Sequence, residues 1–152
     1  MSYARQMLDT YPRTANVDAD LLAAAIDALS DCVQACNADN AADLGEQNVT
    51  EMVTCIRLCL DCADICTATA AVTSRQTESA ANVTRPLLQA CVAICKSCGD
   101  ECERHARMHV TISVTFGSPR SAALSALQAW TQSLSASMAA ASTSASTLNV
   151  RE

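Results

Sequence analysis

The pattern of apolar and polar residues divides the chain into a few long segments typical of α-helices. A short helical stub near residues 2–9 precedes three longer segments, at about residues 18–44, 48–77 and 84–108. Helices of about 25 residues are nearly 40 Å long. Because the connections between them are short, we expect antiparallel neighbours in a helical bundle.

Capping and breaking residues mark the ends of these segments. Gly45 offers a stop for the first segment, and Asn48 followed by Glu51 has the form of a capping box that opens the second. Thr84 can cap the third segment, which would place Pro86 in its first turn, where a missing N–H costs no hydrogen bond. These signals agree with the boundaries that the pattern indicates.

The last segment, residues 110–152, has a different pattern. Residues 110–116 alternate between apolar and hydroxyl side chains, which taken alone predicts a strand. Between residues 121 and 148, 20 of 28 residues are Ala, Ser or Thr. A fourth amphipathic helix can still be drawn there through Leu124, Leu127, Leu134 and Met138. We therefore expect an all-α fold, an antiparallel four-helix bundle with a short N-terminal helix.

Composition supports a single helical domain. Of the 152 residues, 50% are hydrophobic but only 3% are aromatic. The chain has 3 glycines and 3 prolines, which are too few for the many turns of an all-β fold. This length is enough for one ordinary domain. We divide it into an N-terminal stub (1–17), a cysteine-bearing part of three helices (18–109) and the atypical Ala/Ser/Thr-rich segment (110–152).

Charge and the absence of targeting signals narrow the function classes. The net charge of −6 and the single lysine, Lys96, argue against nucleic acid as a partner. The first twenty residues have no apolar run that could form a signal-peptide core, and the uncharged stretch 121–150 is crowded with Ser and Thr. We therefore expect a cytoplasmic protein without a membrane segment. In that compartment thiols stay reduced, so ten cysteines favour metal or redox chemistry over a disulfide framework.

The cysteines recur at helical spacing in two copies of the motif CxxxCxxCxxxC. At about 100° per residue, the four thiols of one copy share one helix face. Half a copy lies on the first long segment, where Asp39 and Asp43 occupy the positions that would continue it. The candidate metal ligands are Cys32 and Cys36 in the half copy, Cys55, Cys59, Cys62 and Cys66 in one full copy, and Cys91, Cys95, Cys98 and Cys102 in the other.

This spacing suits the coordination of soft metal ions. Residues four apart on a helix have Cβ atoms about 5–6 Å apart, so two thiolates can close on one ion. Thiolates without a matching set of His or carboxylate ligands select Cu(I), and a row of them can hold multiple ions. The same spacing is compatible with three other functions: an iron–sulfur electron carrier, a zinc or redox-sensing thiol protein, and a helical interaction module. In the interaction module the cysteines would be small buried hydrophobic residues.

Three further candidate ligands follow the last cysteine. His105 and His109 are four residues apart on one predicted helix face, with Met108 beside them. Imidazole and thioether bind copper, so these residues are candidates for a capture site at the mouth of the bundle. The alternative is a solvated helix end, where basic side chains favour the negative end of the helix dipole. No nucleophile and base constellation is visible, so we expect no enzyme activity.

The segments TCIRLCLDCADICTATAAV and NVTRPLLQACVAICKSCGDECERHARMH resemble the bacterial four-helix-bundle copper storage proteins, specifically their cytosolic branch. The resemblance covers about residues 18–109. It implies a tube of helices whose core is lined by thiolates that bind many Cu(I) ions, for storage or sequestration. A copper chaperone or chelator is then the expected exchange partner.

Two departures from the family pattern lower the expected copper capacity. Asp39 and Asp43 replace cysteines of the first helix, and the last fifty residues contain no cysteine. The change of composition after His109 leaves three expectations open. The segment is a fourth helix without cysteines that closes the bundle, or a tail altered by a change of reading frame. In the third alternative it is a disordered tail, and the three remaining helices cover their thiol faces by self-association.

Overall fold

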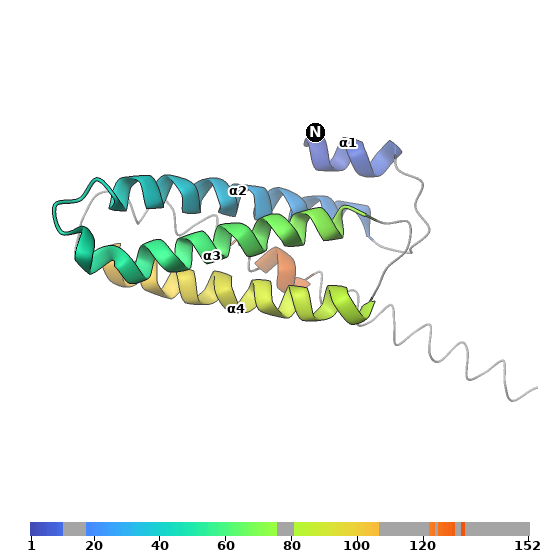
Figure 1. Cartoon of the computed structure of the whole chain (residues 1–152). Helices are drawn as coiled ribbons and strands as arrows, with labels where there is room; N and C mark the ends of the chain where they lie inside the picture. Colours follow the sequence, from blue (N-terminus) through green and yellow to red (C-terminus); the bar gives the residue numbers. More distant parts are fainter. Residues whose placement is uncertain (11–17, 76–80, 107–121, 124, 130–131, 133–152) are drawn as a thin grey trace, which may run out of the picture.

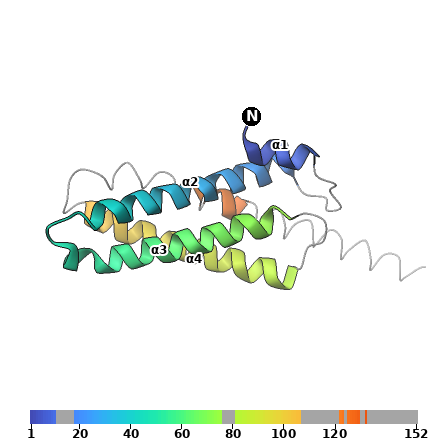
Figure 2. The same ribbon diagram turned by 45° about the horizontal axis from the view of Figure 1, so that its top comes forward.

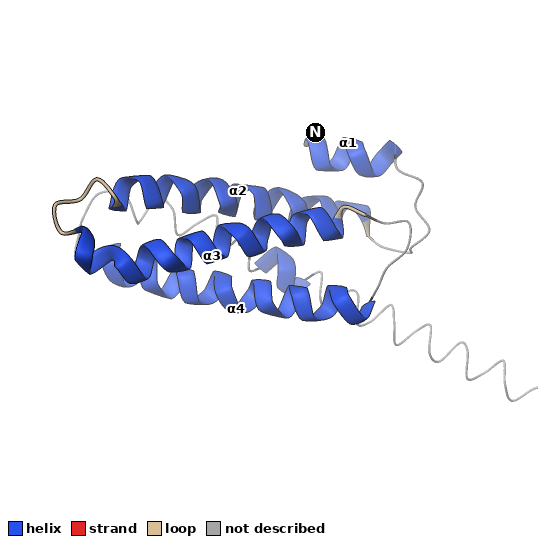
Figure 3. Cartoon of the chain, in the orientation of Figure 1, coloured by secondary structure: helices blue, strands red, loops and turns tan. Residues whose placement is uncertain are grey.

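The structure is a computed structural model that describes residues 1–10, 18–75, 81–106, 122–123, 125–129 and 132. These residues form helices joined by turns, and none of them lies in a strand (Figure 3). The helices are α1 (Tyr3–Thr10), α2 (Ala19–Asp43), α3 (Val49–Thr73) and α4 (Ala81–Ala106). The long helices α2, α3 and α4 lie side by side, each antiparallel to the one before it (Figure 1). The all-α bundle that the sequence predicts is confirmed.

Local signals explain both ends of α2. The Asp18 carboxylate accepts hydrogen bonds from the backbone N–H groups of Asp20 (3.0 Å) and Leu21 (3.1 Å), as an N-cap residue does. At the other end Leu44 is the C-cap, and the Gly45 N–H donates to the Ala42 carbonyl at 3.0 Å. The predicted limits of this helix, residues 18 and 44, are confirmed.

The start of α3 differs from the prediction. Asn48 is its N-cap residue, but its side chain makes no capping hydrogen bond. Its backbone, at φ −103° and ψ 41°, is outside the extended conformation in which a cap side chain reaches the first turn. The Glu51 N–H instead donates to the Asn48 carbonyl at 2.9 Å. The predicted capping box is therefore wrong, although the position of the helix start is right.

Helix α4 is already helical at Ala81, before the predicted cap. Thr84 therefore lies inside the helix and does not cap it. Pro86 lies beyond the first turn, where a proline removes one intrahelical hydrogen bond. The predicted end near residue 108 falls just past Ala106, outside the described residues.

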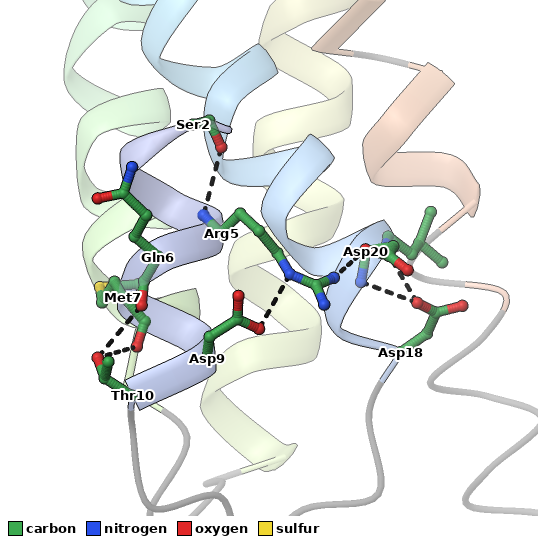
Figure 4. Close-up of polar contacts among 9 residues, drawn as sticks. Ser2, Arg5, Gln6, Met7, Asp9, Thr10, Asp18 and Asp20 are labelled. Atoms are coloured by element: carbon green, nitrogen blue, oxygen red, sulfur yellow. Dashed lines mark hydrogen bonds and ion pairs between the residues drawn. The ribbon is translucent and has the colours of Figure 1, made fainter.

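Helix α1 packs against the N-terminal half of α2. Ala4 and Leu8 are buried in the common core. On the outer side, the Arg5 guanidinium pairs with Asp9 at 3.0 Å and with Asp20 of α2 (Figure 4). The predicted short N-terminal helix thus packs on α2 and adds two side chains to the core.

A fourth helical stretch lies alongside the three long helices (Figure 1, Figure 2). Residues 122–123, 125–129 and 132 are helical, and Ala123 and Leu127 are fully buried in the core. For these residues the predicted fourth helix is confirmed. The strand-like residues 110–116 lie outside the described residues. In the described part of the chain, no helix combines the length and apolarity needed to span a bilayer.

Candidate metal centre

All ten cysteines lie in the core between α2, α3 and α4. Each side chain is 2% exposed or less, and all ten are free thiols. The helical period explains this burial, because each stripe of cysteines occupies the one face of its helix that meets the other two helices. The structure therefore brings together every cysteine that the sequence singles out as a ligand.

The sulfur atoms of α3 lie between those of α2 and α4 and contact both. Sγ–Sγ distances between helices are 3.7 Å for Cys32–Cys62, 3.8 Å for Cys62–Cys95, 3.5 Å for Cys66–Cys95, 3.8 Å for Cys66–Cys91, 3.5 Å for Cys59–Cys98, 3.6 Å for Cys59–Cys102 and 3.5 Å for Cys55–Cys102. Within α3, Cys62 and Cys66 are 3.9 Å apart. The spacing predicts pairs within one helix, but the shorter approaches join different helices.

Three groups of ligand atoms converge closely enough to share an ion. In each group every ligand atom lies within 4.8 Å of the others. The all-thiol cluster is Cys32, Cys62, Cys66 and Cys95, and a smaller thiol group is Cys36, Cys62 and Cys98. The mixed cluster is Asp39, Cys55, Cys59 and Cys102. Cys62 belongs to both thiol groups, and Cys59 of the mixed cluster lies 3.5 Å from Cys98, so the three groups form one continuous row.

Hydrogen bonds between neighbouring thiols lower the pKa of some cysteines and raise the pKa of others. The bond with Cys102 lowers the pKa of Cys55 to about 3, and the bond with Cys66 lowers the pKa of Cys91 to about 4. The pKa of Cys59 is raised, mainly by its hydrogen bond with Cys102. Physically, one thiolate is stabilised by S–H donors around it, and these donors then resist losing their own protons. A metal that binds all of these sulfurs must therefore displace protons.

Asp39 is a core residue, although in the sequence it is only a position where the cysteine motif of the first long segment is interrupted. It is 2% exposed, and its Oδ2 accepts from the Sγ of Cys59 at 3.5 Å and of Cys102 at 3.3 Å. The signal that could have found it is its register, since residue 39 continues the cysteine stripe of α2. Burial, reinforced by the charge of Cys55, raises the pKa of the nearby Asp43 carboxyl to about 7.

His105 stands at the end of α4, next to the mixed cluster. It is 8% exposed, so the predicted alternative of a solvated helix end is wrong for this residue. Its Nε2 lies 3.0 Å from Oε1 of Glu101, whose carboxylate also binds Arg104. The hydrogen bond from Arg104 lowers the pKa of Glu101. Met108 and His109 fall outside the described residues.

The comparisons with known proteins agree with this geometry. The family model described as "Copper storage protein" matches residues 18–116. Three similar solved structures are of the copper storage protein Ccsp from Streptomyces lividans.

The structure of that protein loaded with 10 copper equivalents shares 43% sequence identity with this chain and has a TM-score of 0.81. The match covers 86% of this chain and 98% of the relative. A histidine-to-alanine variant is 43% identical, with a TM-score of 0.74, over 79% and 99%. A form with five coppers, described as cytosolic, is 42% identical, with a TM-score of 0.58, over 79% and 93%. A search of the curated proteins gives no match. With a family match over residues 18–116, this chain belongs to the copper storage protein family.

Proposed function

We propose that this protein stores copper in the cytosol as multiple Cu(I) ions held by the thiolates of its core. The observation that carries the proposal is the continuous row of ten buried, free cysteines. A row of this kind has no use for packing alone, since Ala, Val or Leu would fill the same space without reactive sulfur. The role is therefore retention of metal rather than catalysis.

The chemistry of the ligands favours Cu(I) as the stored ion. Thiolate is a soft ligand, and Cu(I) accepts two or three of them. Sulfur atoms 3.5–3.8 Å apart across three helices let neighbouring ions share thiolates along the row. Structures of the S. lividans relative with five coppers and with 10 copper equivalents support a store that fills in steps.

His105 is the first ligand in the proposed path of copper into the core, together with Met108 and His109. Metal-binding histidines commonly donate the other ring N–H to a carboxylate, which fixes the ring and its tautomer. With Nε2–H donated to Glu101, the Nδ1 lone pair of His105 is available to an ion. A copper chaperone or chelator would deliver the ion by ligand exchange, and the thiolates would then withdraw it into the water-poor core.

Anaerobic titration of the reduced protein with Cu(I) against a competing chelator tests the storage function. We expect several tightly held, colourless equivalents and the release of protons during loading. A single brown cluster after reconstitution with iron and sulfide, with weak Cu(I) binding, would overturn the proposal in favour of an electron carrier. Weak binding of both would indicate an interaction module.

The rate of loading tests the path. Replacing Glu101 with Gln removes the carboxylate that orients His105, so we expect slower Cu(I) uptake at an unchanged final capacity. The matched control is Asp100→Asn, the preceding residue, whose exposed carboxylate pairs with Lys96. Equal uptake rates in the two variants would remove Glu101 from the path.

A further inference from the structure

The mixed cluster differs from the rest of the thiol core because it contains a carboxylate. Asp39 of α2, Cys55 and Cys59 of α3, and Cys102 of α4 place four ligand atoms within 4.8 Å of one another. All four residues are buried. The cluster therefore draws one ligand or more from each of the three long helices.

The C-terminal end of α2 favours a bound cation. Asp39 and Asp43 lie in the last turns of α2, where the helix dipole is negative, and no basic residue occupies the last turn of this helix. Two side-chain atoms nearby, Oδ2 of Asp43 and Nδ1 of His105, are buried without a hydrogen-bond partner among the described residues. Buried polar atoms are costly when unsatisfied, and a cation in the neighbouring mixed cluster would favour both of these electron-rich atoms electrostatically without binding them.

The ligand set also selects a different kind of ion from the rest of the core. Carboxylate oxygen is a hard ligand that Cu(I) disfavours. Zn²⁺ accepts thiolate and carboxylate together, with four ligands in a tetrahedral arrangement. The all-thiol cluster also offers four ligands to Zn²⁺, but its sulfurs suit Cu(I) equally well, whereas the carboxylate sets the mixed cluster apart from a pure Cu(I) site.

We propose that Asp39, Cys55, Cys59 and Cys102 form a site for one divalent ion of the zinc class, which closes this end of the thiol core. The ion joins α2, α3 and α4 and binds only the folded chain, so it stabilises the bundle before copper is loaded. The site shares three thiols with the proposed copper store, and copper at high loading competes for them.

Titration of the reduced, metal-free, full-length protein with Zn²⁺ against a chromophoric chelator tests the site, with Co²⁺ as a spectroscopic probe. We expect a tight equivalent that depends on Asp39, and for Co²⁺ the visible bands of a tetrahedral ion with thiolate charge transfer. Asp39→Asn should weaken this equivalent by at least about 100-fold, since losing even an outer partner of a metal ligand costs about 10–100-fold. The matched control is Cys32→Ser, which removes a sulfur from the all-thiol cluster and leaves the mixed cluster whole.

The pair of variants decides between the two clusters. The proposal fails if Asp39→Asn binds Zn²⁺ as tightly as the unaltered protein, if Cys32→Ser weakens binding as much as Asp39→Asn does, or if the unaltered protein binds no Zn²⁺. Asp39→Cys is a second variant that guards against simple misfolding. It should retain the Co²⁺ bands with stronger charge transfer, because a fourth thiolate replaces the carboxylate.

Copper titration of the same proteins separates this proposal from the storage function. Uptake of several Cu(I) ions without tight Zn²⁺ binding would overturn the zinc site alone. Zn²⁺ binding without Cu(I) uptake would overturn storage alone.

Discussion

The two halves of α2 bury the same helix face with different chemistry. The N-terminal half buries Leu22, Ile26 and Leu29 in the core, whereas the C-terminal half buries Cys32 and Cys36, then Asp39. Apolar burial stabilises a fold by about 25 cal/mol per Å² without any ligand, and a thiol offers less such area than leucine. The helical period thus fixes which face is buried, while the identity of the buried atoms decides whether the stability needs a metal.

The C-terminal half also carries unsatisfied polar groups. The Asn40 side chain is 6% exposed, and neither its Oδ1 nor its Nδ2 has a hydrogen-bond partner among the described residues. Such groups cost about 1–3 kcal/mol each when buried. We therefore expect the metal-free protein to be held together by the aliphatic half and the loaded protein by both.

The largest effect on the metal-free protein is expected from Leu29→Ala. Leu29 is fully buried, so its truncation should lower the free energy of unfolding by about 2–5 kcal/mol through lost burial and a residual cavity. Chemical denaturation of the reduced, metal-free protein measures this. The Cu(I) capacity of the folded fraction should be unchanged, because the variant keeps every thiol. A cost below that of Cys36→Ala would contradict the comparison.

Cys36→Ala is the matched change in the other half of the helix. Cysteine and alanine are both small, so the metal-free protein should lose less than about 1.5 kcal/mol. The rise in melting temperature on Cu(I) loading should shrink, since the variant lacks one thiolate of the row. Thermal unfolding with and without Cu(I) separates the two effects. An undiminished rise on loading would remove Cys36 from the store.

The features of α2 that the sequence predicts are those that depend on residues close together in the chain. The limits of α2 and the cysteine stripe could be predicted because caps and helical period are local properties. The capping box at Asn48 failed because the backbone conformation of the turn overrides the motif. The partners of Asp39 could not be predicted, because Cys59 and Cys102 are 20 and 63 residues away and meet it only through the register of three helices.

A smaller effect is expected from Asp18→Ala at the start of the aliphatic half. The variant loses the two capping hydrogen bonds to the first turn, which should cost about 1 kcal/mol. Asp31→Ala is the control, because it removes an exposed carboxylate of the same helix far from its start. Equal unfolding free energies in the two variants would show that the cap contributes nothing.

The smallest effect concerns Asp43, at the opposite end of α2, and it depends on pH. Its pKa is about 7 in the folded protein against 3.8 for the free side chain, with burial the main cause. Between these two values the folded state binds more protons than the unfolded state, so this group makes stability fall as pH rises.

Asp43→Asn should therefore match the unaltered protein near pH 4 and gain stability relative to it by pH 8. The gain is small because Asp43 is only partly buried and solvent screens its charge. The difference in unfolding free energy between variant and unaltered protein isolates Asp43 from the titrating thiols common to both. Asp31→Asn, which changes an exposed carboxylate, should show no such trend. A relative loss of stability for Asp43→Asn at pH 8 would mean that the charged carboxylate is stabilised in the folded metal-free protein.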